Sequence, residues 1–435
     1  MGEMQVPSDA LYGAQTARAL ENFPISGQPF PRAFIRALGL IKAAAARTNG
    51  SLHQIPRVQA AAIAHAGDEV ADGKYDDQFV LDIFQTGSGT STNMNANEVI
   101  GHLAGAHPND HVNRGQSSND VIPSAIHVAA AILIDEQLLP AMTVLQRALN
   151  EKSSEFRDVL KIGRTHLQDA VPMRLGQEFG GYAAQVEQSI RRIGLALEGI
   201  YELPLGGTAI GTGLNVVPGF AHETIQQLAE STQLPFREAE NHFEAQAAKD
   251  AVCFLSGALR TYAVALTKIG NDIRWLSSLG ELNVPAVQPG SSIMPGKVNP
   301  VIAESVLMVC AQVIGYDAAI AWSCAAGNFE LNVMMPVIAY DLLESISLLA
   351  AASRNFEERC IRGLQANRER ALSFVESSLA MTTALAPEIG YAQAAAIAKE
   401  AHASGRTVRQ VAREKSGLPE DRLNELLDPA TQAGD

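Results

Sequence analysis

Two adjacent serines, Ser291 and Ser292, lie in a glycine-containing stretch, residues 289–300, which we call the serine loop. Lys297 and Asn299 follow in the same loop. Asparagine followed by proline is typical of a helix N-terminus, because the asparagine side chain caps free amides and proline suits the first helical position. Free amides beside a lysine form an anion site. We therefore expect the serine loop to bind an anion, with an ordinary turn that enters a helix as the alternative.

His166 stands in a second polar stretch, residues 161–172, beside Arg164 and Thr165. A histidine titrates near neutral pH, as a general acid or base must. A single histidine is more often structural, but its polar neighbours favour the wall of a pocket over a core helix. On this stretch alone, a catalytic and a structural role both stay open.

A third polar stretch, residues 107–120, begins with His107 and contains His111 four positions later, with Asp110 between them. This spacing superficially resembles a metal-binding helix. Pro108 argues against it, because a helix that covers both histidines would have to begin at the proline. A loop rich in Ser, Asn and His donors suits a carboxylate ligand better. We predict no metal here, and a metallohydrolase remains a minor alternative.

Two further stretches contain glycines. Residues 87–98 place hydroxyls and amides where a loop enters a helix. Residues 205–213 contain several glycines but lack the Lys-Ser/Thr of a phosphate-binding loop and follow no evident strand. Close backbone packing explains the second stretch better than a nucleotide does.

The elements that must position these loops are long helices. Helical periodicity extends over residues 121–152, 177–200, 242–279 and 301–321. Segments of this length exceed the usual globular helix and predict a bundle of long rods, with apolar faces left over for other subunits. From about residue 368 the chain is more charged, and we expect a small domain there, with short helices near residues 388–403, 407–415 and 420–427.

Composition excludes several classes of protein. The chain has 435 residues, 47% hydrophobic and 18% charged, with a formal net charge of -14. Disorder is excluded, because enough apolar surface can be buried, and the acidic charge argues against nucleic acid. The apolar run at 125–134 is too short to span a membrane, and no secretory signal is evident. Four dispersed cysteines predict a reducing compartment, and we expect a soluble cytoplasmic protein.

These stretches together resemble the fumarase/aspartase superfamily. The resemblance extends along nearly the whole chain and includes GSSIMPGKVNP at 290–300, GSGTSTNMNANEVI at 87–100, HPNDHVNRGQSSND at 107–120, GRTHLQDAVP at 163–172 and IGYAQAAAIAKEA at 389–401. It implies an all-α fold of three domains, residues 1–111, 112–366 and 367–435. The central domain would be a long-helix bundle that assembles into a homotetramer, with each active site shared between subunits.

Within the superfamily, Thr165–His166 and Gln116–Ser117–Ser118–Asn119 resemble class II fumarate hydratases, which hydrate fumarate to L-malate. Residues 91–97 and 171–173 look more like aspartate ammonia-lyases, which release ammonia from aspartate, and these are the alternative. A non-enzymatic helical scaffold is a further alternative. One departure is that relatives usually carry a Gly-Pro-Arg-x-Gly tract where this chain runs directly from Ser278 to Leu279.

The resemblance also implies roles for individual residues. Ser291 would be the base, His166 would act with a bound water as the acid, and Glu304 would orient His166. Substrate would be bound by Ser88, Gly89, Thr90, Ser117, Ser118, Asn119, Thr165, Ser292, Lys297, Val298 and Asn299. A secondary dicarboxylate site would be formed by His107, Pro108, Asn109 and Asp110. The implied chemistry needs no metal and no organic cofactor, because preorganised charge stabilises the intermediate.

Overall fold

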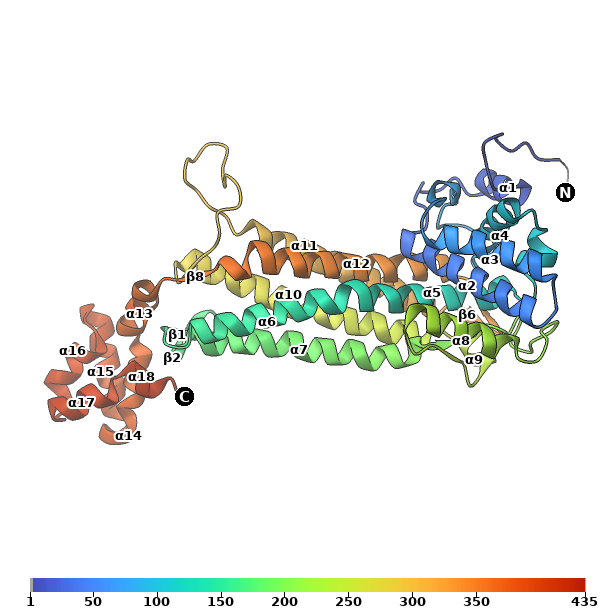
Figure 1. Ribbon diagram of the computed structural model, residues 1–435. Helices are drawn as coiled ribbons and strands as arrows, with labels where there is room; N and C mark the ends of the chain where they lie inside the picture. The colour runs from blue at the N-terminus through green and yellow to red at the C-terminus, as the bar shows by residue number, and fades with distance from the viewer. Residues whose placement is uncertain (1–2, 435) are drawn as a thin grey trace. The chain divides into compact units, whose positions relative to one another are not determined.

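The computed structural model describes residues 3–434 and consists mainly of helices (Figure 1). The α-helices are α1 (Ala14–Asn22), α2 (Arg32–Ser51), α3 (Arg57–Ala71), α4 (Thr90–Ala104), α5 (Ser118–Leu133), α6 (Leu139–Glu155), α7 (Leu175–Ile200), α8 (Phe220–Thr232), α9 (His242–Ala247), α10 (Asp250–Leu279), α11 (Val301–Cys324), α12 (Met335–Arg359), α13 (Arg368–Ser377), α14 (Ala386–Ile389), α15 (Tyr391–Ser404), α16 (Val408–Lys415), α17 (Glu420–Leu426) and α18 (Pro429–Gln432).

Shorter elements connect these helices. The π- and 3₁₀-helical turns are η1 (Asp76–Gln78), η2 (Pro108–Val112), η3 (Ile134–Leu138), η4 (Ile361–Gly363) and η5 (Leu379–Ala384). The strands form four two-stranded sheets: β1 (Leu160–Thr165) with β2 (Gln168–Arg174), β3 (Glu202–Leu203) with β4 (Arg237–Glu238), β5 (Leu282–Asn283) with β8 (Gln365–Ala366), and β6 (Gly327–Asn328) with β7 (Leu331–Asn332). Only the β3–β4 pair is parallel.

The chain divides into two compact units, each made of several chain segments. Unit 1 consists of Met1–Ala141, described from residue 3 onward, with Ser189–Val264 and Val309–Ala351. Unit 2 consists of Met142–Gln188, Ala265–Met308 and Ala352–Asp435, described up to residue 434. Helices α7, α10, α11 and α12 are continuous through both units. The predicted three domains stay a prediction.

In unit 1, α2 and α3 pack backbone against backbone. A Cβ on Gly39 would lie 2.6 Å from the Ala71 nitrogen, and one on Gly67 would lie 2.9 Å from the Ala43 nitrogen. Alanines on the same face of α2, including Ala43, are fully buried. Small side chains allow this approach, since packing at atomic contact leaves no room for larger ones. This pair packs against α4 and α5, whose N-termini lie in two of the polar stretches.

Most of the predicted rods are confirmed, with three differences. The predicted rod at 242–279 is wrong at one point, because extended Ala248 separates α9 from α10. Helix α12 was not predicted from the sequence. The polar stretch that contains His166 forms the β1–β2 hairpin, so the fold is mostly helical and not purely so. The short helices predicted near the C-terminus are present as α15, α16 and α17.

Unit 2 contains a small apolar core near the C-terminus. Side chains from β1, α13, η5 and the last helices gather there, with Ile162, Val375, Leu385, Ile397 and Val411 buried. The core therefore anchors the base of the β1–β2 hairpin, because Ile162 belongs to β1 and is fully buried. The hairpin tip carries Thr165 and His166.

Among the described residues, four helical stretches are long and apolar enough to cross a membrane. They are Ser118–Glu155, Asp250–Leu279, Val301–Cys324 and Met335–Gly363. The sequence-based argument that the apolar run is too short was therefore wrong on length. In three of these stretches 56–67% of the most apolar segment is buried inside the fold, and this burial accounts for the hydrophobicity of the stretch. In Val301–Cys324 only 28% is buried.

Candidate active site

Ser88, Gly89 and Thr90 form a tight entry to α4 in unit 1. Gly89 adopts φ +71° as the N-cap residue, and the Ser88 and Thr90 hydroxyls are 2.7 Å apart. The residue before them, Gly87, accepts a backbone hydrogen bond from Met335 at 3.0 Å. A Cβ on Gly87 would lie 1.8 Å from the Val333 carbonyl oxygen. The two hydroxyls are therefore presented by a segment that is fixed by close packing.

Ser117, Ser118 and Asn119 form the N-terminus of α5, also in unit 1. Ser117 and Asp120 make a capping box, in which the Ser117 hydroxyl accepts from the Asn119 amide and Asp120 accepts from the Ser117 amide at 2.9 Å. The Ser118 hydroxyl accepts from Asn93 at 3.1 Å. The Asn119 side chain donates to the Ala209 carbonyl at 2.8 Å. Each predicted binding residue here is held by a specific hydrogen bond.

The glycine-rich loop at 205–213 packs onto this N-terminus. The second Asp120 carboxylate oxygen accepts amides from Gly206 at 3.0 Å and from Thr208 at 2.9 Å. Thr208 has φ +56°, and its buried side chain faces a cavity of about 680 Å³ that Ser117 also lines. A Cβ on Gly206 would lie 2.5 Å from the Ala221 Cβ, so this glycine serves close packing, as predicted, while Thr208 and Ala209 line the cavity.

The predicted secondary site borders the same cavity. Asn109 and Asp110 line it together with Ser117. They belong to the π-helical turn η2, where Pro108 is the first residue and the His107 ring nitrogen Nδ1 accepts from the Asp110 amide at 3.1 Å. Within unit 1 the structure therefore brings part of the predicted primary set and part of the predicted secondary set around one cavity.

The two histidines of this stretch form hydrogen bonds with neighbouring groups. The His111 Nδ1 accepts from the His107 amide at 3.0 Å and lies 3.0 Å from the Gln59 side-chain nitrogen. Their rings are perpendicular, with centroids 6.4 Å apart. Among residues 3–434, no group of three or more His, Cys, Asp or Glu side chains is placed to hold a metal ion.

Thr165 and His166 lie at the tip of the β1–β2 hairpin in unit 2. His166 and Leu167 both have positive φ, +56° and +59°, which is the conformation of a two-residue type I′ turn. The turn exposes the His166 ring. Its base is fixed by Arg164, which donates to the fully buried Glu281 carboxylate at 2.6 Å. A rigid arm therefore presents the histidine to solvent.

The serine loop, also in unit 2, extends away from the helices that it connects, α10 and α11 (Figure 1). The Ser291 hydroxyl oxygen accepts two backbone amides, from Ile293 at 3.2 Å and from Met294 at 3.0 Å. The loop closes on itself where the Gly290 amide donates to the Lys297 carbonyl at 2.9 Å. Ser292, Lys297 and Val298 are exposed.

The predicted capping role of Asn299 is wrong. Helix α11 begins at Val301, and the Asn299 side chain donates to the Gly290 carbonyl at 2.6 Å. The reason is local: the loop must close between Gly290 and Lys297, and Asn299 stands beside that closure. Its amide nitrogen therefore serves the loop and not the helix end.

A cavity of about 590 Å³ in unit 2 lies between the loop and the helices. Glu304, Val298 and Leu167 line it, and Leu167 adjoins His166. Arg274, Ser277 and Ser278 from the end of α10 complete one wall. The structure thus brings the surroundings of His166, Glu304 and the serine loop together, although it shows no hydrogen bond between His166 and Glu304 among the described contacts.

The end of α10 accounts for the missing tract. Gly280 follows the helix with φ +79°, and the Glu281 amide donates back to the Leu276 carbonyl at 2.9 Å. This is the usual glycine stop of a helix. The chain therefore passes from α10 directly into β5, and Ser277 and Ser278 line the cavity wall.

Sequence reasoning missed two buried charged residues in unit 1, Lys42 and Asp120. Both are fully buried. Burial lowers the pKa of Lys42 to about 7 and raises the pKa of Asp120 to about 6, while their mutual attraction opposes both changes. A lysine within the alanine-rich sequence of α2 was the available signal, because a charged side chain on a buried helix face needs a specific partner.

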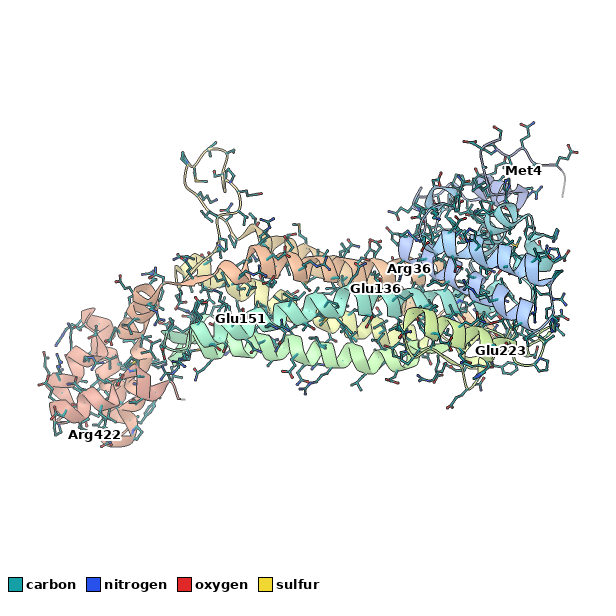
Figure 2. All side chains as sticks on the ribbon, in the orientation of Figure 1. Met4, Arg36, Glu136, Glu151, Glu223 and Arg422 are labelled. Atoms are coloured by element: carbon teal, nitrogen blue, oxygen red, sulfur yellow. The ribbon has the colours of Figure 1, made fainter. Side chains whose placement is uncertain are left out.

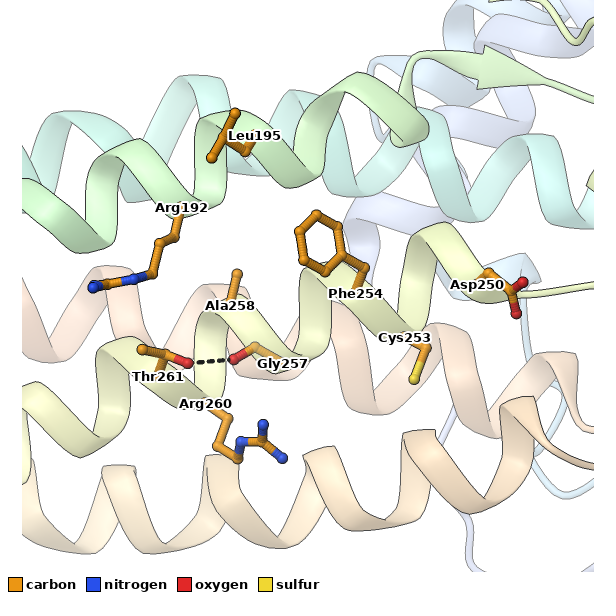
Figure 3. A pocket seen from close by; sticks show the side chains of 9 residues that line it. All are labelled: Arg192, Leu195, Asp250, Cys253, Phe254, Gly257, Ala258, Arg260 and Thr261. Carbon is orange, nitrogen blue, oxygen red and sulfur yellow. Dashed lines mark hydrogen bonds between the residues drawn. The ribbon is translucent and has the colours of Figure 1, made fainter.

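Another cavity of unit 1, about 580 Å³, lies along α7 and α10 (Figure 3). Its lining includes the exposed apolar side chains Leu195 and Phe254, and Arg260, which pairs with Asp317 at 2.8 Å. None of the predicted site residues lines it. Thr261 supplies the one hydroxyl among its lining residues, and no side-chain amide lines it.

Comparisons with known proteins identify the family to which the chain belongs. A family model described as "Lyase" matches residues 2–315, and one described as "Fumarase C C-terminus" matches residues 381–431. The chain belongs to this lyase family of mostly helical enzymes. The similar full-length proteins place it among the class II fumarate hydratases.

The relatives support the placement along the whole chain. The class II fumarate hydratase of Xylella fastidiosa (strain Temecula1) is 50% identical, covering 99% of this chain and 93% of the relative. That of Mycobacterium tuberculosis (strain H37Rv) is 52% identical, covering 98% and 92%. The crystal structure of class II fumarase from Schistosoma mansoni superposes with a TM-score of 0.97 at 41% identity, covering 100% and 98%. A fumarate lyase:delta crystallin structure from Brucella melitensis gives 0.95 at 45%, covering 100% and 98%.

Proposed function

We propose that the protein catalyses the reversible hydration of fumarate to L-malate by acid–base chemistry. The observation that carries this proposal is the Ser291 hydroxyl oxygen, which accepts two backbone amides in a loop that also carries Lys297. Donors at this oxygen favour the alkoxide over the neutral hydroxyl. A serine in this setting serves as a base better than a serine in water.

In the dehydration direction, the Ser291 alkoxide takes the proton from C3 of malate. The electron pair passes into the adjacent carboxylate and forms a dianionic aci-carboxylate. Lys297 and Asn299 bind this group; one Asn299 amide hydrogen closes the loop and the other stays available. Stabilising the growing charge with preplaced donors lowers the barrier most.

The hydroxyl group on C2 then leaves as water. His166, acting through a bound water, supplies the proton, and the C2–O bond breaks as the C2–C3 double bond forms. Glu304 accepts a hydrogen bond from the histidine and orients it. The shared cavity of Leu167 and Glu304 supports this pairing.

The remaining predicted residues bind carboxylates. They supply neutral donors to the substrate or form the walls around it, and they are Ser88, Gly89, Thr90, Ser117, Ser118, Asn119, Thr165, Ser292 and Val298. His107, Pro108, Asn109 and Asp110 form a secondary dicarboxylate site, supported by the cavity that Asn109, Asp110 and Ser117 share. Neutral donors bind a dianion without adding positive charge to an acidic protein.

We infer that the active enzyme is a cytoplasmic homotetramer of three-domain chains, with each active site shared between subunits. Two observations support it. The binding residues at 88–90 and 117–119 belong to unit 1, whereas the acid–base residues belong to unit 2. Helix α11 also leaves large apolar side chains exposed, among them Met308 at 68% and Trp322 at 77%. Four free cysteines suit a reducing compartment.

A two-substrate assay tests the function. Fumarate has strong ultraviolet absorbance, so its formation can be followed separately from L-malate and from L-aspartate. We expect formation from malate and none from aspartate. Formation from aspartate alone would establish the alternative, an aspartate ammonia-lyase, and no formation from either would favour a helical scaffold without activity.

A further inference from the structure

Lys42 on α2 is a fully buried cation, and it hydrogen-bonds to the stretch that leads into the proposed substrate-binding residues. Its ammonium group donates to the Asn113 side-chain oxygen at 3.1 Å and to the Gln116 side-chain oxygen at 2.8 Å. Both acceptors lie just before Ser117, where the binding residues begin. A lysine side chain has three donors and no acceptor, so it fixes oxygen atoms around it.

The two acceptors depend on Lys42 to different degrees. The Asn113 oxygen also accepts from the side chains of Asn93, at 3.3 Å, and Asn97, at 3.1 Å. The Gln116 oxygen has only the lysine as its donor among the described contacts. Removal of Lys42 would leave a partly buried amide oxygen without a donor, and such a group moves toward water.

Asp120 holds the other end of the same stretch. Its carboxylate accepts the amides of Ser117, Gly206 and Thr208, and its charge is attracted to that of Lys42. Segment 113–120 is thus fixed at its start by a buried cation and at its end by a buried anion. Ser117, Ser118 and Asn119 lie between these two points.

We propose that Lys42 is a positioning residue for substrate binding. It sets the conformation of segment 113–116 so that Ser117, Ser118 and Asn119 point their donors toward a substrate carboxylate. This inference rests on the proposed function, because these three residues are binding residues only if a dicarboxylate is the substrate. The lysine itself contacts no substrate.

Burial of a charge is costly, and an apolar residue in its place often preserves stability. The retained lysine therefore points to a geometric role. Burial lowers its pKa to about 7, and attraction to Asp120 opposes this change. A purely structural lysine has the same features, so the test must separate binding from stability.

The test compares Lys42→Met with Lys152→Met in the full-length enzyme. Lys152 is also buried, on α6, and donates to the Leu364 carbonyl at 2.9 Å and to Glu155 at 2.8 Å. We expect both variants to melt earlier. Only Lys42→Met should raise KM for malate, by about tenfold or more, with kcat within about threefold, because uniform binding is lost and not transition-state chemistry. The inhibition constant of succinate, an unreactive dicarboxylate, should rise in parallel.

Gln116→Met provides a second measurement that does not depend on the folding of Lys42→Met. It removes the oxygen that only Lys42 serves. We expect KM to rise again, and the double variant Lys42→Met/Gln116→Met to show a rise no larger than that of the larger single variant. An unchanged KM in Gln116→Met, or equal KM values in Lys42→Met and Lys152→Met, would overturn the positioning role.

Failure of the proposed function is a separate outcome. If the unmodified enzyme formed fumarate from aspartate and not from malate, the hydratase proposal would fall. The same variants would then be measured with aspartate, and a selective rise in KM would still support Lys42 as the positioning residue.

Discussion

The binding residues of unit 1 and the acid–base residues of unit 2 are held in opposite ways. Ser88 and Ser118 are buried, and their segments are fixed by capping, by close glycine packing and by the buried charges of Lys42 and Asp120. His166 stands exposed at a hairpin tip, and the serine loop makes its hydrogen bonds mainly within itself. The geometry of these unit 1 binding residues is therefore set within one unit, whereas the acid and base side chains stand exposed to an approaching substrate or subunit.

This difference fits the work that each region has to do. Neutral donors bind a carboxylate well only when they are already oriented, because ordering them on binding costs entropy. A base and an acid need access to substrate and protection from water in turn, and loops that close on a bound ligand supply both. The exposed apolar side chains Ile293 and Met294 at the tip of the serine loop suit such a closure.

The largest effect is expected from Ser291→Ala. The substitution removes the base but few other contacts, because the hydroxyl accepts only two amides of its own loop. We expect kcat to fall by about 10³-fold or more, with the oligomeric state unchanged. Steady-state kinetics with malate and sedimentation would measure both.

Ser404→Ala is a matched control for that variant. Ser404 is exposed, and its hydroxyl donates only to the Glu400 carbonyl of its own helix. It should keep normal turnover. A Ser291→Ala enzyme with turnover near that of Ser404→Ala would remove Ser291 as the base and with it the chemical half of the comparison.

The next effect is expected from His166→Asn. Asparagine tolerates the positive φ of this turn, so the substitution removes the imidazole ring with little backbone cost. We expect kcat to fall about 10²-fold. His53→Asn is the control, because His53 is also exposed, has φ +57° and belongs to unit 1. Equal activity of the two variants would mean that His166 is only a turn residue.

Much of this comparison was available from the sequence. The polar stretches and their glycines were visible as interruptions between long helices, and the residue types predicted carboxylate binding and acid–base chemistry. The burial of Ser118 and the exposure of His166 were not predictable, because a local pattern does not say which loop is packed by distant segments.

The misses have specific physical causes. Lys42 contacts Gln116 across 74 positions and Asp120 contacts Gly206 across 86, so no local spacing could indicate either bond. Asn299 has the sequence context of a helix cap, but its side-chain nitrogen donates to the Gly290 carbonyl, and among the described contacts no α11 amide donates to its side-chain oxygen. Tertiary contacts thus changed the role of a residue whose local pattern was typical.

Glycine substitutions should have a smaller effect, and they compare how tightly the two regions are packed. Gly87→Ala would place a Cβ 1.8 Å from the Val333 carbonyl oxygen, so the segment that carries Ser88 must shift. We expect a loss of about 2 kcal/mol in the free energy of unfolding and a raised KM.

In the serine loop, a Cβ added by Gly296→Ala would have no neighbouring atom within 4 Å. Its cost comes only from the φ of +81°, which disfavours alanine. It should cost about 1 kcal/mol by denaturant titration and leave KM for malate closer to normal. Equal KM values would show that the two loops are held alike.

The smallest effect concerns His127, a buried histidine of unit 1 that contrasts with exposed His166. Its Nδ1 lies 2.8 Å from the Glu202 carbonyl, and burial lowers its pKa to about 4. The unfolded chain therefore binds more protons than the folded one below pH 6.5, so stability falls as pH falls toward 4. Between pH 7 and 5.5 this group should remove about 1 kcal/mol from the free energy of unfolding. His127→Gln keeps a donor for Glu202 but does not titrate, so urea titrations at both pH values should show a drop smaller by that amount. A drop of the same size in His127→Gln and in the unmodified protein would contradict the contrast between this buried ring and the exposed His166.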